Sequence, residues 1–329
     1  LRAPVQVDLK GAIELYRQAL SLGIVIHAEF VARQISAARP DDLEAQLPLL
    51  DAFTNTLRTD EADPFVAELL DRFGQQPRLL KAAARYYQAA GAADRALQLL
   101  DEAGPLAPAD PDIPWMIGVS RTALGAKAEA IAAFDTALNI APDHVDAWFS
   151  RSLVVKGNDT PQSLAALEQL IADDQQRAPL KQAKLHLAAA WCHEGHDIDA
   201  QLMHLEKAGH LCNSVFPWQE ERAKLQFAAI TGFIDDDLVA AVKAAGNPEP
   251  APIYIAAMPR SGTTLLEQIL GAHSTTQPIG ESQLFNHAIS QAGFDLERST
   301  AYWEWGQGKD FAPVLERFDR GRRRHERVP

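Results

Sequence analysis

The sequence predicts an all-α superhelical repeat that is followed by the start of an α/β domain. Two patterns carry this prediction. Small residues recur every 34 positions over residues 28–130, which is typical of stacked helical hairpins. After residue 252 the chain instead reads PIYIAAMPRSGTTLLEQIL, in which a short apolar run between prolines precedes glycine and hydroxyl residues. That order predicts a strand, a tight turn and a helix.

The 34-residue period shows in several kinds of residue. In phase with one another are Ala28, Ala62, Ala96 and Ala130; Gly23, Gly91 and Gly125; Pro40, Pro108 and Pro142; Phe53 with Tyr87; and Leu100 with Phe134. Each unit therefore predicts a helix, a glycine turn and a second helix that ends at a proline. Alanine on the second helix lets the two helices approach closely. Five to six such units fit over residues 9–211.

The units differ in how well they keep the pattern. Those over 77–110 and 111–144 are the clearest, and their segments YYQAAGAADRALQLLDEAGPLAP and GAKAEAIAAFDTALNIAP resemble the tetratricopeptide repeat. The unit over 145–180 is degenerate, since Asp159 replaces the glycine and Leu164 the alanine. The resemblance implies a solenoid whose concave surface binds a protein or peptide partner, although such a solenoid also serves as a spacer or a dimerisation arm.

Changes in composition mark the later boundaries. Residues 212–246 contain two amphipathic patterns, over about 217–231 and 235–245, which predict helices that cap the apolar end of the solenoid. Residues 247–251 read NPEPA and predict a linker. The new domain is expected over 252–329.

Composition also limits the classes of function. With 31 Lys plus Arg against 44 Asp plus Glu, the net charge of −13 argues against a nucleic-acid or anionic-membrane binder, so any anion site is local. No apolar run reaches the roughly 18 to 20 residues of a spanning helix, and no signal-peptide pattern opens the chain, so we expect a cytoplasmic protein.

Cysteine and histidine spacing predicts no metal site. Cys192 and Cys212 are too few for a disulfide framework and belong to no Cys/His ligand pattern, so we expect reduced thiols. His193 and His196 lack the H-E-x-x-H spacing that places two imidazoles on one helical face, and they fit a turn around Gly195.

The segment 252–270 predicts an anion site where a strand meets a helix. Residues 253–258 fit a buried parallel strand, and residues 264–270 fit a helix. The free N–H groups and the dipole of such a helix attract an anion to its first turn. Gly262 allows positive φ, while Thr263 and Thr264 offer hydroxyl donors. Arg260 adds planar charged donors that suit phosphate or sulfate oxygens.

The loop differs from the Walker A pattern of nucleotide triphosphatases and kinases. Ala257 stands where that pattern has its first glycine, and Thr263 stands where it has lysine. PRSGTT after an apolar strand instead resembles the 5′-phosphosulfate loop of the sulfotransferases, which use 3′-phosphoadenosine 5′-phosphosulfate. Because arginine replaces lysine, the loop is most similar to that of the tyrosylprotein sulfotransferases and of bacterial sulfotransferases with amino-terminal tetratricopeptide repeats.

The resemblance implies roles for the loop and for one downstream carboxylate. The 5′-phosphosulfate would be held by Arg260, Ser261, Gly262, Thr263 and Thr264. Glu281, in a Gly-Glu pair about twenty residues after the loop, matches the family's general base and would take the proton of the acceptor hydroxyl. Arg260 would also stabilise charge in the transition state.

The resemblance covers only the beginning of such a domain. A sulfotransferase domain needs roughly 200 to 250 residues, whereas 78 residues run from 252 to 329. The family's segment for the 3′-phosphate has no counterpart, which implies a domain cut short at its C-terminus. Two functions stay open. One is a sulfotransferase that acts on an acceptor hydroxyl, for instance on a protein or peptide bound by the repeats; the other is a protein-binding scaffold with a non-catalytic segment.

Overall fold

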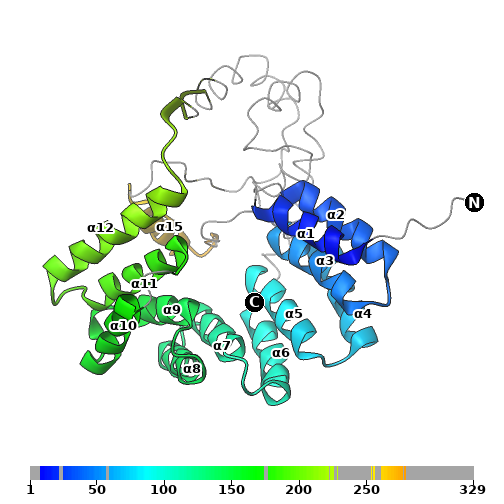
Figure 1. Ribbon diagram of the computed structural model, residues 1–329, viewed down its shortest axis with the longest axis horizontal. Helices are drawn as coiled ribbons and strands as arrows, with labels where there is room; N and C mark the ends of the chain where they lie inside the picture. The colour runs from blue at the N-terminus through cyan, green and yellow to red at the C-terminus, as the bar shows by residue number, and fades with distance from the viewer. Residues whose placement is uncertain are drawn as a thin grey trace, which may run out of the picture. The chain divides into compact units, whose positions relative to one another are not determined.

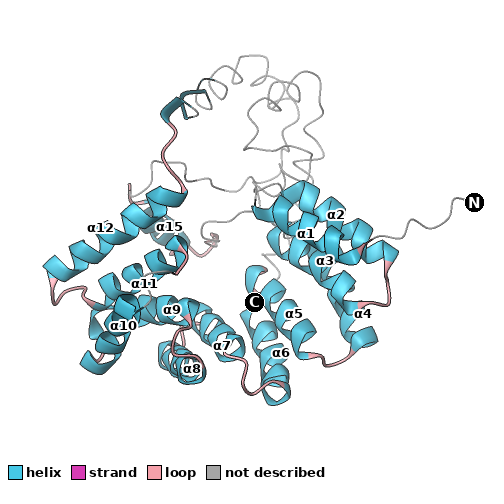
Figure 2. Ribbon diagram, viewed as in Figure 1, coloured by secondary structure: helices cyan, strands magenta, loops and turns pink. Residues whose placement is uncertain are grey.

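The computed structural model describes residues 8–21, 25–56, 59–173, 177–221, 223–225, 228, 253, 255, 261–276 and 278. They belong to two compact units, Leu1–Trp218 and Gln219–Pro329. Helices connected by short loops make up the described part of the first unit (Figure 2). The second unit contributes one labelled helix, α15 (Thr263–Gly271).

The helices of the first unit pair into successive hairpins (Figure 1). The pairs are α1 (Leu9–Ser21) with α2 (Val25–Ala38), α3 (Leu43–Thr56) with α4 (Thr59–Phe73), α5 (Pro77–Ala89) with α6 (Ala93–Leu106), α7 (Asp112–Ala123) with α8 (Lys127–Ile140), α9 (Val145–Val155) with α10 (Pro161–Asp173), and α11 (Pro179–Cys192) with α12 (Ile198–Val215). The first helices of successive pairs start 33 to 35 residues apart. The predicted all-α repeat is therefore confirmed.

Glycine and alanine have the roles that their spacing predicts. Gly91 and Gly125 follow α5 and α7 at φ of 77° and 76°, a left-handed conformation that glycine adopts without a steric penalty. Gly195 turns the chain in the same way between α11 and α12, at φ of 82°. The in-phase residues Ala28, Ala62, Ala96 and Ala130 all have 0% exposure, as expected for small residues at a close contact between helices.

Packing between neighbouring pairs produces the curvature of the repeat. Each of α3, α5, α7 and α9 contacts the next odd-numbered helix, and α3, α5 and α7 also contact their own hairpin partners. Figure 1 shows the odd-numbered helices on the inner side of the arc and α4, α6, α8 and α10 on the outer side. We refer to α3, α5, α7, α9 and α11 as the inner helices.

The degenerate unit contains a buried charge cluster in place of the glycine turn. Between α9 and α10 the side chain of Asp159 is 2% exposed and lies 2.8 Å from Nη1 of Arg151. The same carboxylate oxygen accepts hydrogen bonds from Ser163 Oγ at 3.1 Å and Cys192 Sγ at 3.3 Å. Asp159 therefore joins α9, α10 and α11. This role explains why an aspartate stands where the repeat pattern has glycine.

The two cysteine thiols are expected to differ in reactivity. Burial of Cys192, together with the nearby charge of Asp159 and its hydrogen bond, raises the pKa of this thiol to about 12, whereas Cys212 is half-buried on α12. The thiolate is the nucleophile. Iodoacetamide in mildly alkaline buffer should therefore alkylate Cys212 in the folded protein and Cys192 only after unfolding. Peptide mass spectrometry over time measures this, and equal rates in the folded protein would contradict the burial of Cys192.

Several predictions fall outside the described residues. They include most of the two capping helices, the linker over 247–251, and the side chains of Arg260 and Glu281. Of the predicted strand over 253–258, Ile253 and Ile255 are described, and neither is assigned to regular secondary structure. Within the described part of the chain, no helix has the length and apolar character needed to cross a bilayer.

Candidate functional site

The turn that leads into α15 has the geometry that its sequence predicts. Gly262 precedes the helix at φ of 92° and ψ of 19°, in the left-handed region. A Cβ at this glycine would meet no atom within 4 Å, so the backbone conformation, not crowding, is what favours glycine here. The carbonyl of Gly262 accepts the first helical hydrogen bond, from Leu266 N at 3.0 Å. The helix predicted over 264–270 is confirmed and is one residue longer at each end.

The hydroxyl residues of the loop lie around this helix start. Ser261 and Thr264 are exposed, and Thr263 is half-buried. The first backbone N–H groups of α15 have no partner inside the helix, so they are available to an anion. The structure thus gathers Ser261, Gly262, Thr263 and Thr264 in one turn, whereas Arg260 and Glu281 stay predictions.

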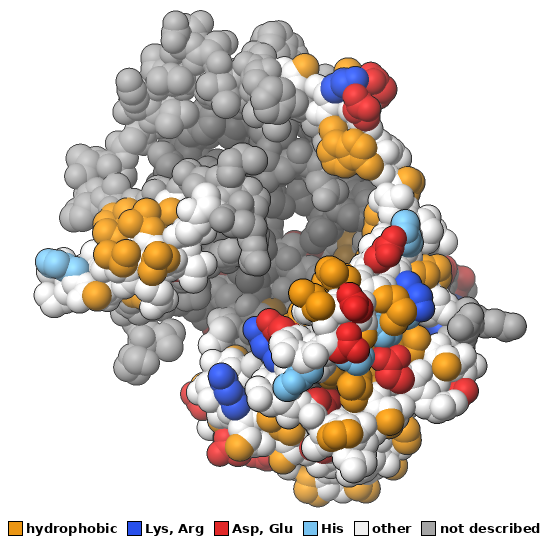
Figure 3. All heavy atoms as spheres, turned by 90° about the vertical axis from the view of Figure 1, so that its left-hand side faces the viewer, with side chains coloured by type: hydrophobic (Ala, Val, Ile, Leu, Met, Phe, Trp, Pro, Cys, Tyr) orange, Lys and Arg blue, Asp and Glu red, His pale blue; other side chains and the backbone are white. Residues whose placement is uncertain are grey.

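α15 has an apolar surface of its own. None of its residues is buried, and Leu265, Leu266 and Ile269 are 66%, 46% and 61% exposed. Figure 3 shows hydrophobic side chains gathered in several places on the face of the molecule that it presents.

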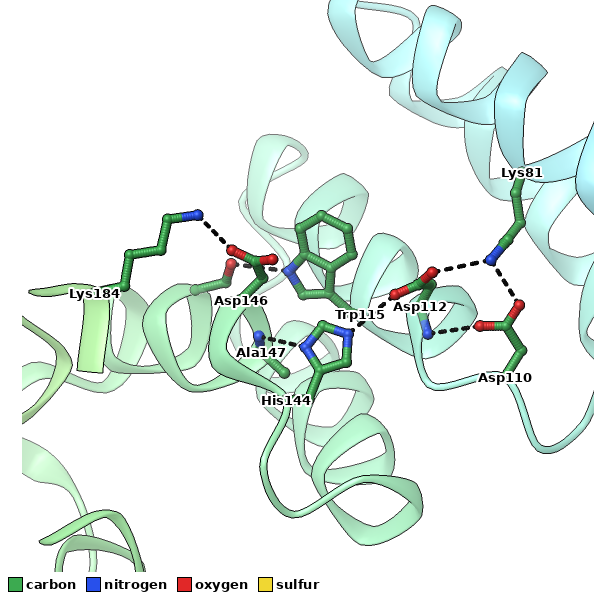
Figure 4. Close-up of polar contacts among 9 residues, drawn as sticks. Lys81, Asp110, Asp112, Trp115, His144, Asp146, Ala147 and Lys184 are labelled. Atoms are coloured by element: carbon green, nitrogen blue, oxygen red, sulfur yellow. Dashed lines mark hydrogen bonds and ion pairs between the residues drawn. The ribbon is translucent and has the colours of Figure 1, made fainter. Parts of the chain in front are cut away.

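A second candidate site is a chain of polar contacts between inner helices (Figure 4). Lys81 of α5 lies 2.6 Å from the carboxylate of Asp110 and 3.0 Å from that of Asp112 at the start of α7. The other oxygen of Asp112 lies 3.1 Å from Nε2 of His144, which caps α9 by accepting from Ala147 N at 3.0 Å. These contacts link three consecutive repeats.

The chain continues toward α11. Asp146 of α9 lies 2.5 Å from Nζ of Lys184 on α11. Lys184 Nζ also lies 5.8 Å from the ring centre of Phe149, whose ring is 5.1 Å from that of Trp191. Trp115 donates from Nε1 to Ser150 Oγ at 3.0 Å. We call the set Lys81, Asp110, Asp112, Trp115, His144, Asp146, Phe149, Ser150, Lys184 and Trp191 the inner-helix surface.

Opposite charges pair within the inner-helix surface. Burial disfavours the charged form of Lys81, but its hydrogen bonds to Asp110 and Asp112 outweigh burial and raise the pKa of the ammonium group. For Asp112, burial is likewise outweighed by the contacts with Lys81 and His144, which lower the pKa of the carboxyl group. Asp112, Asp146 and Lys184 keep 44%, 44% and 45% exposure, so they stay accessible to a partner.

A third cluster joins the last three helices of the repeat. Oε1 of Glu168 on α10 lies 3.1 Å from Nε2 of His193 and 3.0 Å from Nε2 of His204 on α12. Nδ1 of His204 lies 2.8 Å from Nδ1 of His186 on α11. The hydrogen bond with His204, supported by that with His193, lowers the pKa of Glu168 to about 2, and burial lowers the pKa of His186 to about 4.

Known proteins resemble the two parts of this chain separately, one set matching the sulfotransferase-family segment and another the helical repeat. A model of the sulfotransferase family matches residues 252–311. The chain carries a sulfotransferase-family segment. An uncharacterized protein of Aquifex aeolicus (strain VF5) is 41% identical over 87 residues, which are 26% of this chain and 11% of that protein. The chain therefore matches about a tenth of the length of this relative.

The solved structures resemble the helical repeat that precedes the sulfotransferase-family segment. Human IFIT1, determined as a dimer with m7Gppp-AAAA, has a TM-score of 0.51 at 17% identity over 72% of this chain and 59% of its own. PilF of Pseudomonas aeruginosa has a TM-score of 0.45 at 16% identity over 66% of this chain and 96% of its own. At such identities the likeness concerns the fold alone, which is a tetratricopeptide-like repeat.

Sequence reasoning predicted the loop of the sulfotransferase-family segment but missed the two clusters in the repeat. The inner-helix surface had a detectable signal, since the side-chain hydrogen bonds between its residues join positions 29 to 38 apart, close to the repeat period. The cluster of Glu168, His193 and His204 had no detectable signal in the sequence. Its members come from α10, α12 and the C-terminal end of α11, where His193 follows the last helical residue and pairs with Glu168.

Proposed function

We propose that the sulfotransferase-family segment transfers a sulfuryl group from 3′-phosphoadenosine 5′-phosphosulfate to an acceptor hydroxyl. The family match over 252–311 carries this proposal. It is supported by the left-handed Gly262 at the start of α15, because the first backbone N–H groups of a helix have no partner within it and can donate to an anion. We take 252–329 as the catalytic portion, preceded by repeats over 9–211, capping helices over 212–246 and a linker over 247–251.

Each loop residue has a role in the proposed reaction. The sulfate and the 5′-phosphate accept hydrogen bonds from the amides and hydroxyls of Ser261, Gly262, Thr263 and Thr264. Arg260 binds the same oxygens with its charged donors. As the acceptor oxygen bonds to sulfur, the bond from sulfur to the phosphate oxygen breaks, and adenosine 3′,5′-bisphosphate leaves. Negative charge grows on the bridging oxygen, where the helix start and Arg260 stabilise it.

Glu281 is the proposed general base. The acceptor hydroxyl is a weak nucleophile until it loses its proton, and a positioned carboxylate that takes the proton accelerates such a step by about 10²- to 10⁴-fold. Glu281 thus acts on the acceptor and the loop acts on the donor, so substitutions at the two places should affect different steps.

Sulfate transfer in the full natural gene product tests the proposal. With radiolabelled donor and a library of hydroxyl acceptors, Glu281→Ala should lower turnover by about 10²- to 10⁴-fold and leave donor binding unchanged. The matched control is Glu129→Gln, which removes an exposed carboxylate on α8 and should leave turnover unchanged. Absence of transfer by the wild type, or equal transfer by Glu281→Ala, would reject the assignment.

The second candidate function is a protein-binding scaffold, and the inner-helix surface favours it. Exposed carboxylates, a lysine and partly exposed aromatic rings lie along consecutive inner helices, which suits a peptide that offers both charged and apolar side chains. On a peptide array, Asp146→Asn with Lys184→Gln should weaken capture, while Arg95→Gln on α6 should not. If Asp146→Asn with Lys184→Gln captures peptides as well as the wild type does, the inner-helix surface is not the binding site. If the acceptor hydroxyl belongs to the captured peptide, the repeat binds the substrate that the sulfotransferase-family segment sulfates.

A further inference from the structure

Glu168, His193 and His204 have no part in the proposed function, yet their donor atoms meet between the last helices of the repeat. One carboxylate oxygen and two imidazole nitrogens all lie within 4.8 Å of one another. We propose that Glu168, His193 and His204 bind one divalent transition-metal ion of the zinc class, which ties α10, α11 and α12 together.

The distances suit a four-coordinate ion. Zinc binds imidazole nitrogen and carboxylate oxygen at about 2.0–2.2 Å, so donor atoms on one tetrahedral ion lie about 3.3 Å apart. The contacts of Glu168 Oε1 with His204 Nε2 at 3.0 Å and with His193 Nε2 at 3.1 Å are close to this edge length. The remaining edge, between the two imidazoles, closes by a shift of His193, which lies at the end of α11 and whose side chain is 15% exposed.

His186 supplies the outer support that metal-binding histidines require. A coordinating imidazole almost always donates its second N–H to a neighbour, which fixes the ring orientation. Nδ1 of His204 lies 2.8 Å from Nδ1 of His186, and both side chains are buried. In the metal-free protein Nε2 of His204 donates to Glu168. When an ion binds, His204 would donate from Nδ1 to His186 instead, and the lone pair of Nε2 would be free for the ion. The contact with His186 uses the ring nitrogen of His204 that does not face Glu168.

The donor set selects the class of ion. Two imidazoles and one carboxylate suit Zn²⁺ and its transition-metal neighbours, whereas Mg²⁺ and Ca²⁺ prefer oxygen ligands throughout. The thiol of Cys192 donates to Asp159 at 3.3 Å and belongs to that separate cluster. The side chain of Glu168 is 38% exposed, so water can reach the fourth position.

The architecture of α10 gives the ion a structural purpose. Along α10 the structure describes Leu167 as buried and its other residues as at least partly exposed. Glu168 is the next residue and faces His204 of α12. Further residues of α10 also pack, partly buried, against the hydrophobic cluster that contains Leu167, namely Leu164, Leu170 and Ile171. A metal ion would add a polar attachment of α10 to the end of the repeat beside this apolar one.

Metal uptake by the full chain tests the site. Protein stripped with a chelator is titrated with Zn²⁺ by calorimetry and, separately, with Co²⁺. We expect one ion per chain, a higher melting temperature with Zn²⁺, and the strong visible absorption of tetrahedral Co²⁺ without a thiolate charge-transfer band. No uptake at a one-to-one ratio, or a thiolate band, would overturn the proposal. The hydrogen-bonded cluster would then be a structural contact alone.

Variants separate this site from adventitious surface binding. Glu168→Gln and His193→Ala change partly exposed side chains and should abolish one-to-one uptake, whereas His186→Ala should weaken it by about 10- to 100-fold. The control is His210→Ala. His210 is exposed on α12 and lies 3.6 Å from Glu206 one turn away, an arrangement typical of adventitious metal binding at a helix surface. Helical circular dichroism without metal verifies the fold of each variant. Uptake that is lost in His210→Ala and kept in a folded His193→Ala would contradict the assignment.

Discussion

Replacing Asp159 by alanine is expected to lower the free energy of unfolding by about 3–5 kcal/mol, because it leaves a buried guanidinium without its main partner. The side chain of Arg151 is 8% exposed and pairs with Asp159 at 2.8 Å and with Asp135 at 2.6 Å. Burial opposes the charge of Arg151, but its hydrogen bonds to Asp159 and Asp135 outweigh burial and raise the pKa of the guanidinium. Without Asp159, the charge keeps one partner, whose side chain is 48% exposed.

The two partners of Arg151 serve as matched variants. Asp135→Ala removes the exposed partner and should cost about 1 kcal/mol or less, since solvent screens that pair. Urea unfolding followed by circular dichroism measures both losses. Equal losses for Asp159→Ala and Asp135→Ala would contradict the central position of Asp159 in this cluster.

The second large effect is expected at Phe134, whose replacement by alanine should cost about 3–5 kcal/mol. Phe134 is 1% exposed on α8. A Cβ placed on Gly118 of α7 would lie 2.4 Å from the Phe134 ring, so the ring fills the space that this glycine leaves. Removing the ring opens a cavity that the two helices close only in part.

Gly118→Ala tests the same contact from the opposite side. In the wild type it should cost about 1–3 kcal/mol through overpacking against the Phe134 ring. With Phe134→Ala already present, the added methyl group enters the cavity, so most of that cost should vanish. A double-mutant cycle by urea unfolding measures the difference. Additive losses at these two positions would show that the ring and the glycine are not in contact.

The repeat could be predicted from sequence because each of its signals is local. Gly91 and Gly125 mark turns through their backbone conformation, and in-phase alanines mark close helix contacts. Asp159 broke the period, and sequence could not reveal its role, since Arg151, Ser163 and Cys192 come from three helices. A buried ion pair depends on tertiary packing, which a one-dimensional pattern does not contain.

The candidate sites also differ in whether the sequence alone could predict them. The loop around Gly262 was predictable because a helix start, positive φ and hydroxyl donors occur within a few consecutive residues. The cluster of Glu168, His193 and His204 was not, because its donors are 11 to 36 residues apart and follow no ligand spacing. A site made of consecutive residues can be recognised in a sequence. A site whose residues come from several helices can be recognised only once the fold is known.

Binding of adenosine 3′,5′-bisphosphate to the full natural gene product tests the central claim most directly. Isothermal titration calorimetry should detect one nucleotide per chain. Arg260→Ala should weaken the affinity by about 10- to 100-fold, because each hydrogen bond to a charged group contributes about 1.5–3 kcal/mol. Arg95→Gln on α6, which belongs to the helical repeat, should leave the affinity unchanged. Absence of binding, or equal affinity in Arg260→Ala, would contradict a nucleotide site at the start of α15.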